Sequence, residues 1–327
     1  MPDEARKNSS AVAEIANSQH FRSDVKEALM PNCNSNVRRK PLAPIAPSGQ
    51  RLTTESYQLL RDRLLSEYPD VRCELARAVS SVPKAPLDVE SVWAALGSKP
   101  LFSSTKLAAV AQYTKAWDSK LFPTMEDFLA PDWEIRYRPI AKKGWRSNSC
   151  YTYNSARVAD LHARLKQMGA PRVSVSRLHA MRNSAHWLRQ RVAEVGETGN
   201  LIDIKLENCE TAEKLYDAIA PLCRALGLGW GQTTVFHALV DAGFDVVKPD
   251  IHVTRTLAFF SELGDSDAAC KKTRNYLASP YGPARVVHAA RTLAKSIEPL
   301  ASSNGNAYRE VDIVLLHASA TGFLTVL

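Results

Sequence analysis

The stretch LGLGWGQTTVFHALVDAGFDVVKPDIHVTRTL (residues 226–257) decides the fold that we predict for this chain. Its glycines at Gly227, Gly229 and Gly231 separate two segments whose apolar residues recur at helical spacing. Because glycine lets a backbone turn sharply, the pattern predicts two helices joined by a tight turn. The second helix should end at Gly243, since glycine is favoured just beyond a helix C-terminus.

The turn between these helices is a candidate anion-binding site. Backbone N–H groups of residues 229–232 should point outward at the start of the helix that begins near Thr233, and such groups bind phosphate without side-chain charge. A nucleotide-phosphate loop is disfavoured because the GK[ST] ending is missing, and a dinucleotide-binding turn because a helix precedes the glycines. We expect Trp230 to be a packing residue wedged between helices. The predicted contacts to an anionic partner are Gly227, Gly229, Trp230, Gly231, Gln232, Thr233 and Thr234.

The segment after the hairpin carries a second chemical signal. Pro249 restricts the backbone, and Asp250 follows it at the start of the helical pattern IHVTRTLAFF. The Gly-Trp-Gly turn, the helix after it and the stretch KPDIHV (residues 248–253) together resemble the helix-hairpin-helix DNA glycosylase superfamily. That family's pattern is a Gly-x-Gly turn, a helix and a Val-Asp-Thr-His-Val-like stretch. The resemblance is strongest over residues 226–257 and extends over residues 174–320, where REVDIVLLHASA (residues 309–320) is similar to a C-terminal helix of some members.

The resemblance implies a mostly α, two-lobed helical DNA glycosylase fold and an enzyme of base excision. Members flip a damaged or modified base out of the duplex and break its N-glycosidic bond. Asp250 matches the family's catalytic aspartate, whose ionised carboxylate stabilises the oxocarbenium character of the sugar or activates the attacking water. The alternative for Asp250 is a plain helix N-cap, a position that aspartate often fills.

One departure from the family pattern concerns lysine. Bifunctional members carry a lysine two residues after the second glycine of the turn, and this chain has Thr233 there. The resemblance therefore implies a monofunctional, hydrolytic glycosylase without lyase activity. Lys248, two residues before Asp250, is interpreted as a loop lysine or a phosphate contact. The cysteine spacing of the family's iron–sulfur loop is absent, and we expect no metal or other cofactor.

Basic residues gather in one segment of the chain. The whole chain has a net charge of +8, whereas Trp133–Arg191 holds 13 lysines and arginines and two acidic residues, a net of +11. Aromatic residues are interleaved with the basic ones, which suits phosphate contacts and base stacking. We expect phosphate contacts from Arg136, Arg138, Lys142 and Lys143, and a base pocket that includes Trp187, Tyr153 and His252. The alternative is an ordinary surface with solvated arginines and buried aromatic side chains.

Four regions are expected along the chain. Residues 1–50, rich in Asn, Ser and Pro, predict a disordered tail. Residues 51–132 predict an N-terminal helical extension. Residues 133–172 form the basic aromatic segment, with a short β-hairpin or an ordered loop. Residues 173–327 are expected to form the helix-hairpin-helix glycosylase-like domain.

Composition limits the class of protein. The 327 residues are 45% hydrophobic, which is enough for a core, and no apolar run is long enough to span a membrane. The N-terminus lacks the apolar stretch of a secretion signal, and the six cysteines form no Cys-x-x-Cys pair of the kind found in zinc ribbons. We expect a cytoplasmic monomer, nucleoid-associated if bacterial, whose partner is double-stranded DNA. The competing functions are a non-catalytic helix-hairpin-helix DNA-binding protein and a helical protein that binds other proteins.

Overall fold

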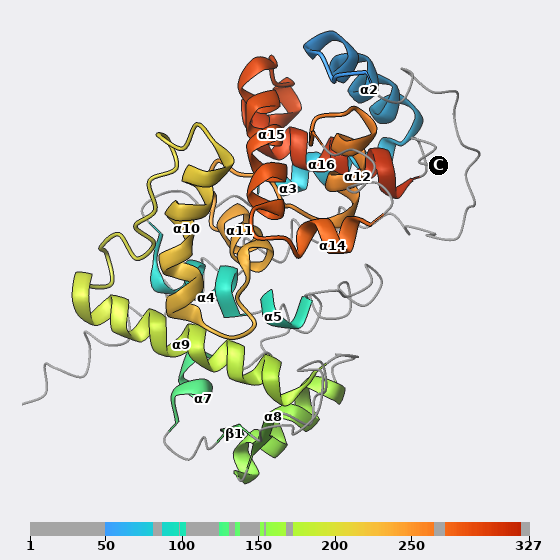
Figure 1. Ribbon diagram of the computed structural model, residues 1–327. Helices are drawn as coiled ribbons and strands as arrows, with labels where there is room; N and C mark the ends of the chain where they lie inside the picture. Colours follow the sequence, from blue (N-terminus) through green and yellow to red (C-terminus); the bar gives the residue numbers. More distant parts are fainter. Residues whose placement is uncertain are drawn as a thin grey trace, which may run out of the picture. The chain divides into compact units, whose positions relative to one another are not determined.

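The computed structural model describes residues 50–80, 87–97, 99–102, 124–130, 135–137, 151–153, 155–167, 173–264 and 272–321. Contacts divide the chain into residues 1–40 and 41–327, and every described residue belongs to the second unit. The predicted tail, of which only Gln50 is described, and the candidate contacts Arg138, Lys142 and Lys143 lie outside the described residues. The described part is mostly helical, as the sequence predicts (Figure 1).

Local sequence sets the bounds of the helices. In several of them a side-chain oxygen accepts a hydrogen bond from a backbone N–H of the first turn, as Thr53, Thr124, Ser174 and Thr211 do. The helices of the described part are, in chain order, α2 (Thr54–Glu67), α3 (Pro69–Ser80), α4 (Val89–Gly97), α5 (Lys99–Phe102), α7 (Met125–Leu129), α8 (Ala156–Gln167), α9 (Val175–Val195), α10 (Ala212–Leu226), α11 (Gln232–Asp241), α12 (Ile251–Phe259), α14 (Thr273–Leu277), α15 (Gly282–Ser296), the 3-10 helix η2 (Ala301–Ser303) and α16 (Ala307–Ala320).

Two short strands lie in the basic aromatic segment, where a β-hairpin was expected. Strand β1 (Ile135–Tyr137) pairs antiparallel with β2 (Tyr151–Tyr153), and Arg136 stands opposite Thr152 in the register. The backbone of Arg136 and of Tyr153 is therefore placed. The side chains of these two residues lie outside the described part, so their predicted contacts stay predictions.

Buried apolar side chains form two cores. The first core is built from α4, α5, α7, α8, α9, α10 and α11, and the second from α2, α3, α12, α14 and α16, with α15 contributing to both. The N-terminal α2 and α3 thus share a core with the C-terminal helices, across the expected boundaries at residues 132 and 172. After the hairpin, the chain passes from the first core at Val246 to the second core at Val247.

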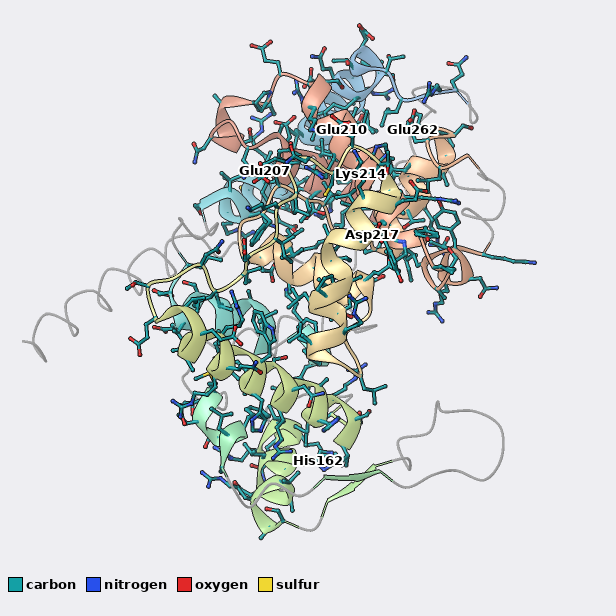
Figure 2. The ribbon with its side chains drawn as sticks, turned by 60° about the vertical axis from the view of Figure 1, so that its left-hand side comes forward. His162, Glu207, Glu210, Lys214, Asp217 and Glu262 are labelled. Atoms are coloured by element: carbon teal, nitrogen blue, oxygen red, sulfur yellow. The ribbon has the colours of Figure 1, made fainter. Side chains whose placement is uncertain are left out.

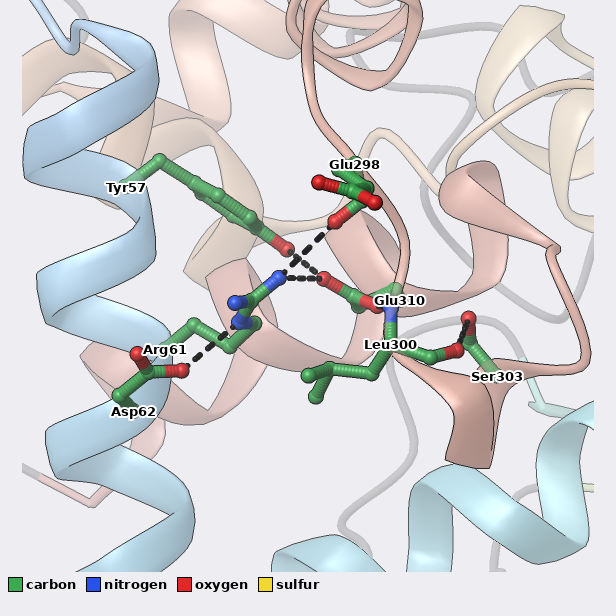
Figure 3. Close-up of polar contacts among 7 residues, drawn as sticks. All are labelled: Tyr57, Arg61, Asp62, Glu298, Leu300, Ser303 and Glu310. Atoms are coloured by element: carbon green, nitrogen blue, oxygen red, sulfur yellow. Dashed lines mark hydrogen bonds and ion pairs between the residues drawn. The ribbon is translucent and has the colours of Figure 1, made fainter.

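Polar contacts fasten the N-terminal part of the second core to its C-terminal part. The Glu310 carboxylate of α16 is fully buried and accepts hydrogen bonds from Arg61 Nη1 at 3.0 Å, Tyr57 Oη at 3.4 Å and the Leu300 N–H at 2.7 Å (Figure 3). A second contact joins the Leu52 N–H to a carboxylate oxygen of Glu262, labelled in Figure 2, at 2.8 Å. Because the Glu310 carboxylate has donors for both oxygens, its burial leaves no oxygen without a partner.

Candidate functional site

The predicted hairpin is present as α10, a glycine turn and α11. Gly229 has a φ of +91°, a conformation that favours glycine, and a Cβ at this position would lie 2.8 Å from the Cβ of Ala180 in α9. The Trp230 side chain is buried in the first core and its Nε1 donates to the Ala180 carbonyl at 3.1 Å. The expected packing role of Trp230 is therefore confirmed. Its inclusion among the contacts to an anionic partner is wrong for the side chain, because the ring is covered by protein.

The first turn of α11 is open at its N-terminus. Gly231 is the N-cap, no side chain caps the turn, and a Cβ on Gly231 would meet nothing within 4 Å. The N–H groups at the start of a helix lack acceptors within the helix, so those of residues 232–234 are donors for a ligand at this end. The Gln232 side chain is engaged differently, because its Nε2 donates to the Pro280 carbonyl at 2.5 Å and ties α11 to the loop before α15.

Asp250 is the N-cap of α12. Its Oδ1 accepts a hydrogen bond from the Val253 N–H at 2.8 Å, so the N-cap interpretation is confirmed, while the catalytic interpretation stays a prediction. The residue keeps part of its surface exposed. Burial raises the pKa of the Asp250 carboxyl, and the Val253 hydrogen bond and the charge of Lys248 oppose that rise.

Lys248 lies at the boundary between the two cores, directly after Val247. Its ammonium group is 3.7 Å from Oδ1 of Asp241, the last residue of the hairpin helix, and the other oxygen of Asp241 contacts Lys99 Nζ of α5. Asp241 thus bridges two lysines from different parts of the chain. The structure places Lys248 in an ion pair, and the predicted phosphate contact of Lys248 stays a prediction.

A buried carboxylate of α16 holds the backbone before Asp250. Asp312 is 1% exposed, and its Oδ1 accepts a hydrogen bond from the Lys248 N–H at 2.9 Å. Its Oδ2 is 4.0 Å from Nη1 of Arg309, whose Nη2 donates to the Val240 carbonyl at 2.5 Å. Burial raises the pKa of Asp312, the positive charges of Lys248 and Arg309 oppose that rise, and the charge of Asp250 adds to it. Asp312 and Asp250 are therefore close enough to interact electrostatically.

Sequence reasoning did not single out Lys99, Asp241, Arg309 or Asp312. A signal for two of them is present, because Arg309, Glu310 and Asp312 interrupt an otherwise apolar helical run over residues 307–320. Buried charged groups require partners, so such residues in an apolar helix predict ion pairs or a site. The sequence does not show which residues those partners are.

Two of the predicted base-pocket residues have described side chains, and the surroundings of these two side chains differ. His252 Nδ1 lies 3.3 Å from the Ser319 hydroxyl of α16, and burial lowers the pKa of His252. Trp187 is partly buried and packs against the first core, which favours the alternative of an ordinary packing residue. The ring of Tyr153 lies outside the described part.

Several arginines of the basic segment have acidic partners. Ion pairs join Arg157 to Asp127 at 3.8 Å, Arg164 to Asp160 at 3.1 Å, Arg189 to Glu126 at 3.4 Å and Arg191 to Glu194 at 2.6 Å. For these four arginines the structure favours the alternative of an ordinary charged surface. The four predicted phosphate contacts are other residues, and the described side chains do not include them.

Comparisons of the chain with protein-family models, with curated proteins and with solved structures found no match. Within the described residues, no helix is long and apolar enough to cross a membrane. The same residues contain no group of three or more His, Cys, Asp or Glu side chains arranged to hold a metal ion.

Proposed function

We propose that this protein is a monofunctional DNA glycosylase, which flips a damaged or modified base and hydrolyses its N-glycosidic bond. One observation carries the proposal. The open N-terminus of α11 and the carboxylate of Asp250 belong to consecutive helices joined by residues 242–249, which the structure places at the junction of two helical cores. A phosphate anchor and an acidic group are thus carried by consecutive helices of the chain.

The hairpin supplies the contact to the DNA backbone. Uncapped N–H groups at the start of α11 carry the positive end of the helix dipole and donate to phosphate oxygens. Gly231 leaves open space in front of them, so a phosphate group can approach the backbone closely. This contact reads no base, and it therefore suits an enzyme that must first bind undamaged duplex.

Asp250 supplies the charge at the reacting sugar. In the proposed reaction the C1′–N bond breaks, the base leaves with the bonding electrons, and the oxygen of water forms the new bond to C1′. An ionised carboxylate beside C1′ stabilises the positive charge that develops and accepts the proton of the attacking water.

The absence of a lysine at the Schiff-base position supports hydrolysis. Thr233 stands in the first turn of α11, and the ammonium group of Lys248 is directed to Asp241. The product should therefore be DNA with an intact abasic site. Borohydride should trap no covalent complex between the protein and DNA.

The test is base release from a panel of duplex oligonucleotides that carry alkylated purines, deaminated bases, oxidised guanine or hypermodified phage bases. Release of at least one base, with the strand unbroken until alkali is added, supports a monofunctional glycosylase. Strand cleavage with borohydride trapping would replace it with a bifunctional enzyme, and Lys248 would be the first lysine to substitute. If no base were released from any duplex, the proposal that the protein is a DNA glycosylase would be refuted.

The N-cap hydrogen bond to Val253 accounts for Asp250 without any chemistry, which supports a second candidate function. In that case the chain is a non-catalytic helix-hairpin-helix DNA-binding protein. Gel-shift measurements at two salt concentrations would show DNA binding that weakens with salt in both cases. Binding to every duplex of the panel without release of a base would favour the non-catalytic protein.

A further inference from the structure

We infer that Arg309 and Asp312 of α16 are positioning residues, which hold the hairpin and Asp250 at a fixed separation. The inference rests on the proposed function, because it assigns these residues to the geometry of base release. Each residue contacts the backbone at one end of the connection between α11 and α12.

Arg309 holds the end of the hairpin helix. The Val240 carbonyl belongs to the last turn of α11, where carbonyl groups lack N–H donors within the helix, and it accepts from Arg309 Nη2 at 2.5 Å and from the Gly243 N–H at 3.1 Å. The Arg309 side chain is 9% exposed, so water competes little for this bond. The guanidinium therefore fixes the C-terminal end of the helix whose N-terminal end carries the proposed phosphate anchor.

Asp312 holds the segment that leads to Asp250. The Lys248 N–H, which donates to Asp312 Oδ1 at 2.9 Å, stands two residues before Asp250 and one before Pro249. Asp312 is buried, and the ring of Pro249, the residue after Lys248, fixes the φ angle there. The direction in which the chain enters α12 is therefore constrained. The position of the Asp250 carboxylate follows from that direction.

The two contacts are linked through one turn of α16. Arg309 Nη1 and Asp312 Oδ2 are 4.0 Å apart, so the residues also face one another. A phosphate held at the hairpin and a carboxylate at Asp250 thereby share one rigid frame. A misplacement of a reacting group by about 1 Å can cost roughly 100-fold in rate, so this frame bears directly on base release.

The same helix provides a matched control. Glu310 is also fully buried and paired with an arginine, but its partners are Tyr57, Arg61 and Leu300, which belong to α2 and the segment before η2. Loss of the Glu310 charge should disturb the second core and leave the Lys248 segment in place.

The experiment compares the full-length chain with Asp312→Ala, Asp312→Asn and the control Glu310→Gln. Deuterium exchange of the Lys248 N–H, followed by NMR, reports the Asp312 contact and requires no substrate. Single-turnover base release and affinity for undamaged duplex are measured at a temperature where circular dichroism shows every protein folded. Asp312→Leu, an apolar side chain that fills the same space, replaces Asp312→Ala if that variant does not fold.

Asp312→Ala should speed exchange of the Lys248 N–H at least about tenfold. It should slow base release at least about tenfold and change the affinity for undamaged duplex by less than about threefold. Asp312→Asn should restore both exchange and base release to within about threefold of the wild-type values, because its amide oxygen still accepts the Lys248 N–H. Glu310→Gln should change neither the exchange of the Lys248 N–H nor the rate of base release. Arg309→Met, which removes the bond to Val240, should slow base release as Asp312→Ala does.

Unchanged exchange of the Lys248 N–H in Asp312→Ala would overturn the role of Asp312, as would equal slowing of base release in Asp312→Asn and Asp312→Ala. If Glu310→Gln slowed base release as much as Asp312→Ala does, the slowing would be a general effect of losing a buried charge and would not support a positioning role of Asp312. Base release at the wild-type rate by Arg309→Met would overturn the positioning role of Arg309. If the wild-type chain releases no base, the proposed glycosylase fails, and the exchange measurement still decides whether Asp312 holds the Lys248 segment.

Discussion

Glu310 and Asp312 stand two residues apart on α16, and both are buried carboxylates near an arginine. Glu310 is bound by Arg61 and Tyr57 of α2, a helix that lies more than 240 residues earlier in the chain. Asp312 is bound by the N–H of Lys248, beside the junction of the two cores and the N-cap of α12. The first carboxylate joins α16 to α2, and the second joins α16 to the candidate site.

Burial and pairing therefore do not by themselves identify a functional carboxylate. The two residues share a helix, a low exposure and a charge partner. They differ in what their partners do in the fold. Residues two apart on a helix point in directions about 160° apart, so one helix serves both networks without contact between them.

The largest expected effect is on stability, for Glu310→Ala. Removal of the buried carboxylate leaves the Tyr57 hydroxyl and the Leu300 N–H without their acceptor, while Arg61 keeps Asp62 and the Glu298 carbonyl, and the free energy of unfolding should fall by about 3 kcal/mol or more. Urea denaturation followed by circular dichroism measures this change. Base release per folded molecule should stay at the wild-type rate. If Glu310→Ala lost both stability and the rate of base release per folded molecule, the networks of Glu310 and Asp312 would not be independent.

The next effect is on rate, for Asp250→Asn. Asparagine fills an N-cap as well as aspartate does, so the free energy of unfolding should change by less than about 1 kcal/mol. The ionised carboxylate is lost, and base release should slow by about 100–1000-fold. Single-turnover assays on the true substrate, with duplex affinity as the control, test this. Near-normal turnover would leave Asp250 as an N-cap alone.

Two glycines extend the comparison to the hairpin. Gly229→Ala places a methyl group against Ala180 at a positive φ, and the unfolding free energy should fall by about 1–3 kcal/mol. Gly231→Leu projects into open space and should change stability by less than about 1 kcal/mol. It should nevertheless weaken binding of damaged and undamaged duplex alike, since it blocks the approach of phosphate. Unchanged affinity of Gly231→Leu in fluorescence anisotropy would mean that DNA does not contact this turn.

The smallest effect is a shift in pH dependence. Burial raises the pKa of Asp250 above the 3.8 of an ordinary aspartate, while Lys248 and His317 oppose the rise. Base release should fall as the pH drops through this raised pKa, because the protonated carboxyl cannot stabilise the oxocarbenium. The sign for stability is opposite, since a raised pKa favours the protonated, folded state at low pH. If base release by Asp250→Asn fell at low pH in the same way, the group that titrates would be a residue other than Asp250.

Local patterns were sufficient for much of the hairpin and for the start of α12. The glycine turn and the N-cap at Asp250 follow from backbone conformation within a few positions of each other. The predominance of helix and the short paired strands follow from periodicity in the same way. These features depend on near neighbours in the chain, and the sequence displays those directly.

The packing of distant helices determines which charged residues meet around the candidate site. Lys99 reaches Asp241 across 142 positions of sequence, and the Lys248 N–H reaches Asp312 across 64. Such pairs form because helices far apart in the sequence pack together, α5 against α11 and α16 against α12, an arrangement that no local pattern encodes. A buried charge signals in sequence that a partner exists, and the packing of distant helices selects the partner.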